Sequence, residues 1–185
     1  MIEVRFHGRG GQGAVTSAEL VALTAIEEGK YAQAFPSFGP ERRGAPVTAF
    51  LRVNDKPIRL REKIYHPDVV VVLDATVMNT TKVDEGMRDG GILVVNTDKG
   101  PEELRRAYGL KHRVAAVDAS RIAMETLGVP IANTVMLGAL VKATGIVKPQ
   151  SISGPLAKRF GPIAAKNQKA YERAFEETRV EGQSD

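Results

Sequence analysis

A run of five apolar residues at positions 69–73 constrains the fold more than any other feature of the sequence. It consists of four valines and a leucine, with an aspartate at each end. β-Branched side chains favour strands, and a strand that is apolar on both sides is normally buried on both faces. A second run of this kind occupies residues 92–95. Two such strands need covering elements above and below the sheet, which predicts a three-layer α/β domain.

The rest of the chain alternates between strand-like and helix-like patterns. Residues 47–60 predict an antiparallel hairpin that turns at Asn54 and Asp55. The expected fold class is therefore α/β: a three-layer Rossmann-like domain with a mixed, mostly parallel sheet and an antiparallel hairpin. The other strands are predicted at 2–7, 30–35 and near 113–117, and helices at 14–28 and near 75–85, 101–108, 119–127 and 133–144.

The last third of the chain is predicted to be helical. Asn133 is expected to cap a helix whose residues 135–141 are apolar almost all round, so this helix should be central. Pro162 suits the first position of a final helix. A single domain over residues 1–180, with a frayed tail at 181–185, is expected. One face of the final helix carries Ile163, Asn167, Ala170, Tyr171, Ala174, Phe175 and Thr178.

The chain contains no cysteine. Thiolates hold Cys₄ iron–sulfur clusters and most structural zinc, so the chain cannot ligate such a cluster by itself. The three histidines, His7, His66 and His112, share no metal-ligand spacing, and no metal site is predicted. Any redox centre that the system uses is therefore expected on another chain.

The net charge of +4 is spread along the chain rather than gathered in one patch, apart from basic pairs such as Arg105-Arg106. That pattern argues against a nucleic-acid partner. It leaves solvated surface charge, or a mildly basic surface for an acidic partner or an anion, as the interpretations. No apolar run approaches the ~20 residues that span a bilayer, and no signal peptide is evident, so we expect no membrane partner and a cytoplasmic location.

A glycine-rich loop after the first predicted strand matches the G-x-G-x-x-G pattern of dinucleotide-binding proteins. Such binding also needs an acidic residue about 20 positions further on, and residues 33–36 (QAFP) contain none. Two other interpretations stay open: a tight strand–helix turn, or a loop that presents N–H groups to a partner chain or a bound anion. The candidate residues are Gly8, Arg9, Gly10, Gly11, Gln12 and Gly13.

A second motif, residues 35–46 (FPSFGPERRGAP), combines three prolines and two glycines with a charged centre. Adjacent arginines can fork onto a carboxylate or a phosphate, although internal salt bridges are an equally open interpretation. Since this loop follows the second strand and the glycine loop follows the first, both should leave the same edge of a parallel arrangement. The interface or anion-binding candidates here are Phe38, Gly39, Glu41, Arg42 and Arg43.

Four polar residues, His7, Asp74, Asn96 and Asp118, lie at predicted strand ends. They could share the carboxyl-end rim of the sheet, where α/β folds bind ligands. The alternative is a structural histidine and two helix N-caps at Asp74 and Asp118. The sequence offers no nucleophile–base pair, so no catalytic residue is predicted.

Three motifs together resemble one family: residues 7–13 (HGRGGQG), the 35–46 loop, and residues 133–140 (NTVMLGAL). They are similar to the gamma subunit, or gamma domain, of pyruvate/2-oxoacid:ferredoxin oxidoreductases, and the resemblance runs from residue 2 to about 178. The long loop is its most specific part. The form GPERRGAP resembles pyruvate or 2-oxoisovalerate enzymes more than 2-oxoglutarate ones, and pyruvate synthase is favoured.

The resemblance implies an accessory, non-catalytic subunit of a complex that oxidatively decarboxylates a 2-oxoacid to acyl-CoA. It places thiamine diphosphate, Mg²⁺, [4Fe–4S] clusters and coenzyme A on or with partner chains, with none bound by this chain alone. The implied partners are alpha, beta and delta subunits, with ferredoxin accepting electrons from the complex. The alternatives are a free-standing dinucleotide-binding oxidoreductase, a 2-oxoisovalerate- or indolepyruvate-type gamma-like subunit, and a plain interaction module.

Overall fold

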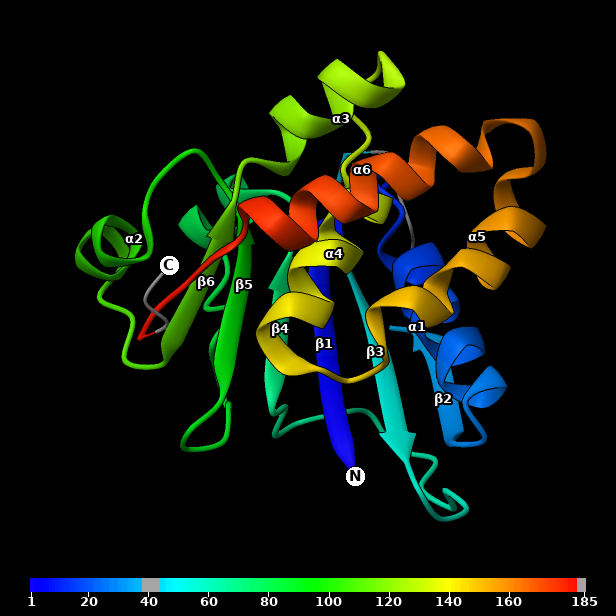
Figure 1. Ribbon diagram of the computed structural model, residues 1–185. Coiled ribbons are helices and arrows are strands. Elements are labelled where there is room, and N and C mark those ends of the chain that lie inside the picture. Colours follow the sequence, from blue (N-terminus) through cyan, green and yellow to red (C-terminus); the bar gives the residue numbers. More distant parts are fainter. Residues whose placement is uncertain (38–43, 183–185) are drawn as a thin grey trace.

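The computed structural model describes residues 1–37 and 44–182, which form one seven-stranded sheet with helices on both faces (Figure 1). Strands β1, β4, β5 and β6 run parallel, β3 is antiparallel to both of its neighbours, and β7 is antiparallel to β6. The predicted mixed, mostly parallel sheet is confirmed. In spatial order the strands are β2 (Tyr31–Pro36), β3 (Pro46–Asn54), β1 (Ile2–Arg9), β4 (Val69–Val72), β5 (Ile92–Asn96), β6 (Arg113–Val117) and β7 (Arg179–Val180).

The helices divide into a larger layer in front of the sheet and a smaller one behind it. In Figure 1, α4 and α6 cross the front of the sheet, and α1 lies beside β2 and β3. The α-helices are α1 (Ala14–Glu27), α2 (Pro101–Tyr108), α3 (Ala119–Leu127), α4 (Asn133–Thr144), α5 (Ser153–Phe160) and α6 (Ala164–Glu177). Short 3₁₀ helices are η1 (Ala75–Asn79), η2 (Pro149–Ile152) and η3 (Gly161–Ile163).

Strand β4 separates two apolar cores. Val69 and Val71 belong to the front core, with side chains of α1, α3, α4 and α6. Val70 and Val72 belong to the rear core, which also contains Leu104 of α2. All four valines are nearly or fully inaccessible, so the predicted burial of this run on both faces is confirmed. The need to cover both sides of β4 is what places helices on both faces of the sheet.

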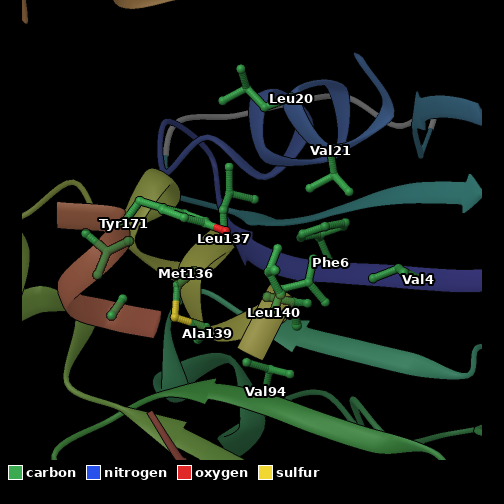
Figure 2. Close-up of a cluster of buried hydrophobic side chains, with 14 of the residues drawn as sticks. Val4, Phe6, Leu20, Val21, Val94, Met136, Leu137, Ala139, Leu140 and Tyr171 are labelled. Carbon is green, nitrogen blue, oxygen red and sulfur yellow. The ribbon is translucent and has the colours of Figure 1, made fainter. Parts of the chain in front are cut away.

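Helix α4 lies at the centre of the front core, as predicted. Its residues from Asn133 to Val141 are all buried. Figure 2 shows Leu137 and Leu140 among Phe6 of β1 and Tyr171 of α6. Gly138 faces α6 so closely that an added Cβ would lie 2.2 Å from the carbonyl oxygen of Tyr171. A glycine is therefore required where the two helix backbones approach each other.

Two predicted elements are wrong. Residues 58–60 are not a strand, and β3 instead pairs with β2 on one side and with β1 on the other. The antiparallel hairpin of the fold is thus β2–β3. The predicted helix at 75–85 is only the 3₁₀ turn η1, followed by turns in which Glu85 N donates to Lys82 O and Met87 N donates to Asp84 O. Successive tight turns bring Val77, Val83 and Met87 onto the rear core.

Two helix starts also differ from the prediction by one or two residues. Asn133 is the first residue of α4 rather than its N-cap, and its Oδ1 accepts a hydrogen bond from Thr134 N at 2.8 Å. Pro162 lies in η3, and α6 begins at Ala164. The predicted buried face of α6 is confirmed at Asn167, Ala170, Tyr171 and Ala174, whereas Ile163 is exposed.

Replacing Gly138 with Ala tests the α4–α6 contact. We expect the free energy of unfolding to fall by about 1–3 kcal/mol, since the new methyl group forces backbone or side chains apart. Gly154→Ala in α5 is the matched control, because its Cβ meets only the carboxylate end of Glu27, at 3.0 Å. In the control, the free energy of unfolding should be unchanged or rise by up to about 1 kcal/mol, because alanine has a higher helix propensity than glycine. Equal urea denaturation midpoints for the two variants would show that the close approach of α4 and α6 at Gly138 does not require a glycine.

Candidate functional site

The two loop motifs of the sequence meet at the carboxyl edge of the sheet. Because β3 runs antiparallel to both β1 and β2, these two strands point the same way and their following loops leave the same edge. Gly10 N donates to Ala45 O at 2.9 Å, and Gly44 N donates to Gly10 O at 3.3 Å. The two loops thus leave the same edge, as the sequence predicted, and the end of the long loop is also hydrogen-bonded to the glycine loop.

The glycine loop also packs closely against the start of helix α4. Gly13 has φ +82°, and a Cβ on it would lie 2.6 Å from Asn133 Nδ2. Gly11 has φ +92°, again a conformation that L side chains rarely adopt. The glycines therefore serve a tight strand–helix turn packed on the start of α4, and the first and third sequence motifs touch here.

Side chains from two segments, with a main-chain carbonyl group from a third, form a polar network at this edge. Gln12 accepts from Arg9 N at 2.6 Å and donates to Asp74 Oδ2 at 2.9 Å. The Arg9 guanidinium donates from Nη2 to Thr76 Oγ1 at 2.9 Å and from Nη1 to Gly44 O at 3.2 Å. Asp74 in turn accepts from Thr76 N at 2.9 Å, so it caps η1 as the structural interpretation expected. Thr76 is the member that sequence reasoning missed.

The network keeps Asp74 ionised. Partial burial alone would raise the pKa of Asp74, but hydrogen bonds from Thr76 and Gln12 and the nearby charge of Arg9 together hold that pKa below its ordinary value. Arg9 Nε lies 3.4 Å from Asp74 Oδ2. Arg9 and Gln12, proposed from the sequence as interface or anion-binding residues, are therefore bonded within the chain, and their action between chains stays a prediction.

A cleft of about 500 Å³ lies next to this network, at the carboxyl ends of β1, β4, β5 and β6. Three of the four predicted rim residues line it: Asp74, Asn96 and Asp118. Asn96 donates to Leu73 O and to Ser120 Oγ, both at 2.9 Å. Asp118 caps α3 by accepting from Arg121 N at 3.0 Å. Asn96 thus connects the end of β5 to the end of β4 and to α3, and Asp118 connects the end of β6 to α3.

The cleft does not suit a dinucleotide. Its lining includes the carboxylates Asp74, Asp98 and Asp118, which would repel a pyrophosphate. In dinucleotide-binding folds the second strand lies beside the first and presents an acid to the ribose. Here the antiparallel β3 separates β2 from β1, and β2 ends in Pro36. The free-standing dinucleotide-binding alternative has no support in this geometry.

His7, the fourth predicted rim residue, lies elsewhere. It belongs to a second cleft, on the rear face of the sheet, and is 7% exposed. Burial, with a smaller contribution from the charge of Arg5, lowers the pKa of His7 to about 4, so the imidazole is neutral at pH 7. The sequence did carry a signal for this polar face, since Glu3, Arg5 and His7 alternate along one strand.

The remaining candidate residues, Phe38, Gly39, Glu41, Arg42 and Arg43, lie outside the described residues. Within residues 1–37 and 44–182, His, Asp and Glu side chains form no group of three that could hold a metal ion. No helix in that part of the chain is long and apolar enough to cross a membrane.

A seven-stranded mixed sheet with helices on both faces defines a domain of the α/β class. The chain belongs to the pyruvate ferredoxin/flavodoxin oxidoreductase family, whose model matches residues 3–177. The resemblance stated from the sequence is thereby confirmed.

Two relatives and one solved structure illustrate the similarity. A Thermococcus kodakarensis chain, "Pyruvate/ketoisovalerate oxidoreductases common subunit gamma", is 56% identical over 182 residues, which cover 97% of this chain and 98% of that one. "Pyruvate synthase subunit PorC" of Methanosarcina barkeri is 55% identical over 152 residues, 82% of each chain. The crystal structure of pyruvate oxidoreductase subunit PORC from Thermotoga maritima superposes with a TM-score of 0.87 at 41% identity, covering 97% of this chain and 98% of that one.

Replacing Asp74 with Ala removes the cap of η1 and the acceptor for Gln12. We expect the free energy of unfolding at pH 7 to fall by about 1–2 kcal/mol, as for other lost caps. Because the pKa of Asp74 is lower in the folded chain than in the unfolded chain, the part due to ionisation is present above about pH 4 and is lost as the pH falls further. The difference between variant and wild type should therefore narrow in acid.

Asp98→Ala is the matched control for this prediction. Asp98 lines the same cleft but is exposed, and its carboxylate has no hydrogen bond to the described residues. Its loss should change the free energy of unfolding by less than about 0.5 kcal/mol. Equal losses of unfolding free energy for the two variants, measured by urea titration at pH 7, would show that the network does not stabilise the fold.

Proposed function

We propose that this chain is the accessory gamma subunit of a multi-chain 2-oxoacid:ferredoxin oxidoreductase that converts pyruvate to acetyl-CoA. The observation that carries the proposal is the near-complete overlap with whole gamma and PorC chains, 97% of this chain on 98% of the Thermococcus relative. The partners would be alpha, beta and delta subunits, with ferredoxin as the electron acceptor of the complex, in the cytoplasm.

The residues of this chain do not fit the redox cofactors of such a complex. Iron–sulfur clusters need thiolates, and the sequence has no cysteine. The carboxylates of Asp74 and Asp118 cap η1 and α3. Among the described residues, no three His, Asp or Glu side chains lie close enough together to hold a metal ion. Thiamine diphosphate, Mg²⁺ and the clusters are therefore assigned to partner chains, and coenzyme A to a site on or with them. This subunit would contribute a rigid surface.

The choice of 2-oxoacid is also assigned to the partner chains. The Thermococcus relative is named as a subunit common to pyruvate and ketoisovalerate oxidoreductases. A chain shared by two enzymes cannot by itself select between their substrates. A role in a 2-oxoisovalerate enzyme is thus the second candidate, and it can coexist with the first.

Purification of a tagged chain from its native cells tests the proposal. We expect identified thiamine-dependent and cluster-bearing chains to co-purify in constant ratio, and the complex to reduce a viologen dye with pyruvate and coenzyme A. The isolated chain should fold, be colourless and have no such activity. A lone homo-oligomer with bound nucleotide, or stoichiometric iron or flavin on the isolated chain after dialysis, would overturn the proposal.

The same purification tests the long loop. If Arg42 and Arg43 act between chains, changing both to Ala should leave the melting temperature of the isolated subunit nearly unchanged, since exposed charge pairs contribute only about 0–1 kcal/mol. Recovery of partner chains should instead fall clearly, because desolvated charged contacts are worth about 2–5 kcal/mol at an interface. A large loss of subunit stability with normal assembly would show that these arginines form salt bridges within the chain instead.

A further inference from the structure

The rear face of the sheet differs between its two halves. Behind β4, β5 and β6 lies the rear apolar core, covered by η1 and α2. Behind β1, β2 and β3 the side chains are polar or aromatic, and alternation places Glu3, Arg5 and His7 of β1 there. The segment after β3 crosses this half, where Arg52 Nη2 donates to Lys63 O and Gln33 Nε2 donates to Ile58 O. The α1 helix covers only the opposite, front side.

A cleft of about 700 Å³ opens on this polar half. Its floor includes Arg5, His7 and Phe50, and its walls are residues 63–66 on one side and residues 81, 82, 85 and 86 on the other. Lys63 and Lys82 stand exposed on the two walls. The only carboxylate among its lining residues is that of Glu85, so the described lining carries an excess of positive charge.

Arg5 is the half-buried cation at the centre of the cleft. It donates from Nη2 to Val83 O at 2.9 Å and to Glu85 O at 2.7 Å, and from Nε to His7 Nε2 at 3.1 Å. No carboxylate of the described residues lies within 4 Å of its guanidinium. Burial lowers the pKa of Arg5, although the charges of Glu85 and Asp84 act to raise it. A partly buried cation whose hydrogen-bond partners are neutral is stabilised by an added anion.

Two other arginines of the same face show what Arg5 lacks. Arg52 Nε lies 2.8 Å from Glu3 Oε1, and Arg88 Nη2 lies 2.9 Å from Glu3 Oε2. Arg52, the most deeply buried of the three, is thus matched by a carboxylate inside the chain. Arg5 has hydrogen-bond partners in the described part of the chain, but the carboxylates of Glu85 and Asp84 act on it only from beyond 4 Å.

The neighbouring groups of Arg5 are also donors. His7 accepts from Arg5 at Nε2, so the neutral ring carries its proton on Nδ1. The ammonium groups of Lys63 and Lys82 have no carboxylate of the described residues within 4 Å. A cleft whose available groups are mostly donors and cations is complementary to carboxylates.

We propose that this rear cleft binds an acidic segment of a partner subunit, with a carboxylate of that segment approaching Arg5. The inference rests on the proposed function, because it needs a partner chain. A cleft whose walls are exposed at Lys63, Tyr65 and Lys82 suits a chain segment better than an enclosed small molecule. Tyr65 is 62% exposed on its wall, and Tyr31 is 47% exposed further along the same face. Tyrosine and arginine are enriched at protein interfaces.

Charge reversal on the cleft walls tests the proposal. Lys63→Glu with Lys82→Glu changes two exposed side chains and leaves the bonds of Arg5 intact. Lys111→Glu with Lys169→Glu is the matched control, since both lysines are exposed, have no ion pair with the described residues and give the same change in charge. Each tagged double variant is co-expressed with untagged wild-type gamma and the partner subunits, and the ratio of the two gamma chains in the purified complex is measured.

We expect the Lys63/Lys82 variant to be incorporated at least tenfold less than wild type, and the control to be incorporated about equally. Both isolated variants should melt at the wild-type temperature. Equal incorporation of the two variants would overturn the inference while leaving the proposed function intact. Normal incorporation with a raised KM for pyruvate or coenzyme A would also overturn it, because the cleft would then serve a small anion. If wild-type gamma itself joined no partner chain, the proposed function would fail first.

Lysine acetylation of the wild-type protein gives an independent readout that needs no variant. Lys63 and Lys82 should react in the isolated chain and be protected at least fivefold in the assembled complex. Equal reactivity of both lysines in the two states would contradict docking at this cleft, even if the charge-reversed variant failed to fold.

Discussion

Helix α4 is enclosed by the sheet, α1, α3 and α6, and the order of the front layer depends on how closely it can approach α6. Gly138 permits that approach, since a single added methyl group would collide with the carbonyl of Tyr171. The start of the same helix reaches the rim of the sheet, where Asn133 packs against Gly13. The position of the glycine loop is thus set by the packing of the core. A shift of α4 would displace both the loop and the polar groups that it holds.

The polar groups at the carboxyl edge mainly bind one another. In many α/β proteins this edge holds a ligand. Here Gln12 joins the glycine loop to Asp74, and Asn96 joins β5 to Leu73 and Ser120. The hydrogen bonds of this edge are therefore made within the chain, which suits a subunit that presents a preformed surface. The rear half-sheet is the contrasting region, because its cations exceed its carboxylates and its central arginine has only neutral partners.

The sequence predicted the elements whose signal is local. The valine run at β4 and the all-round apolar pattern of α4 specify burial without knowledge of their neighbours, and both predictions are confirmed. The hairpin was misassigned because the partner of β3 is chosen by non-local pairing: residues 47–53 lie beside β1, 39 to 51 residues earlier. The rim network needs positions that only the fold provides, since Thr76 is 67 residues from Arg9. The rear cleft was missed because residues 63–66 and 81–86 come together with β1 only in the folded chain.

Amide hydrogen exchange, measured on the isolated chain and on the assembled complex, tests most directly whether this subunit folds alone and contributes surface rather than chemistry. We expect the amides of α4 and β4 to exchange slowly and equally in both states, because their core is complete within the chain. Residues 62–66 and 81–86 should exchange more slowly only in the complex. Rapid exchange of α4 and β4 in the isolated chain, with protection only after assembly, would contradict an independently folded subunit.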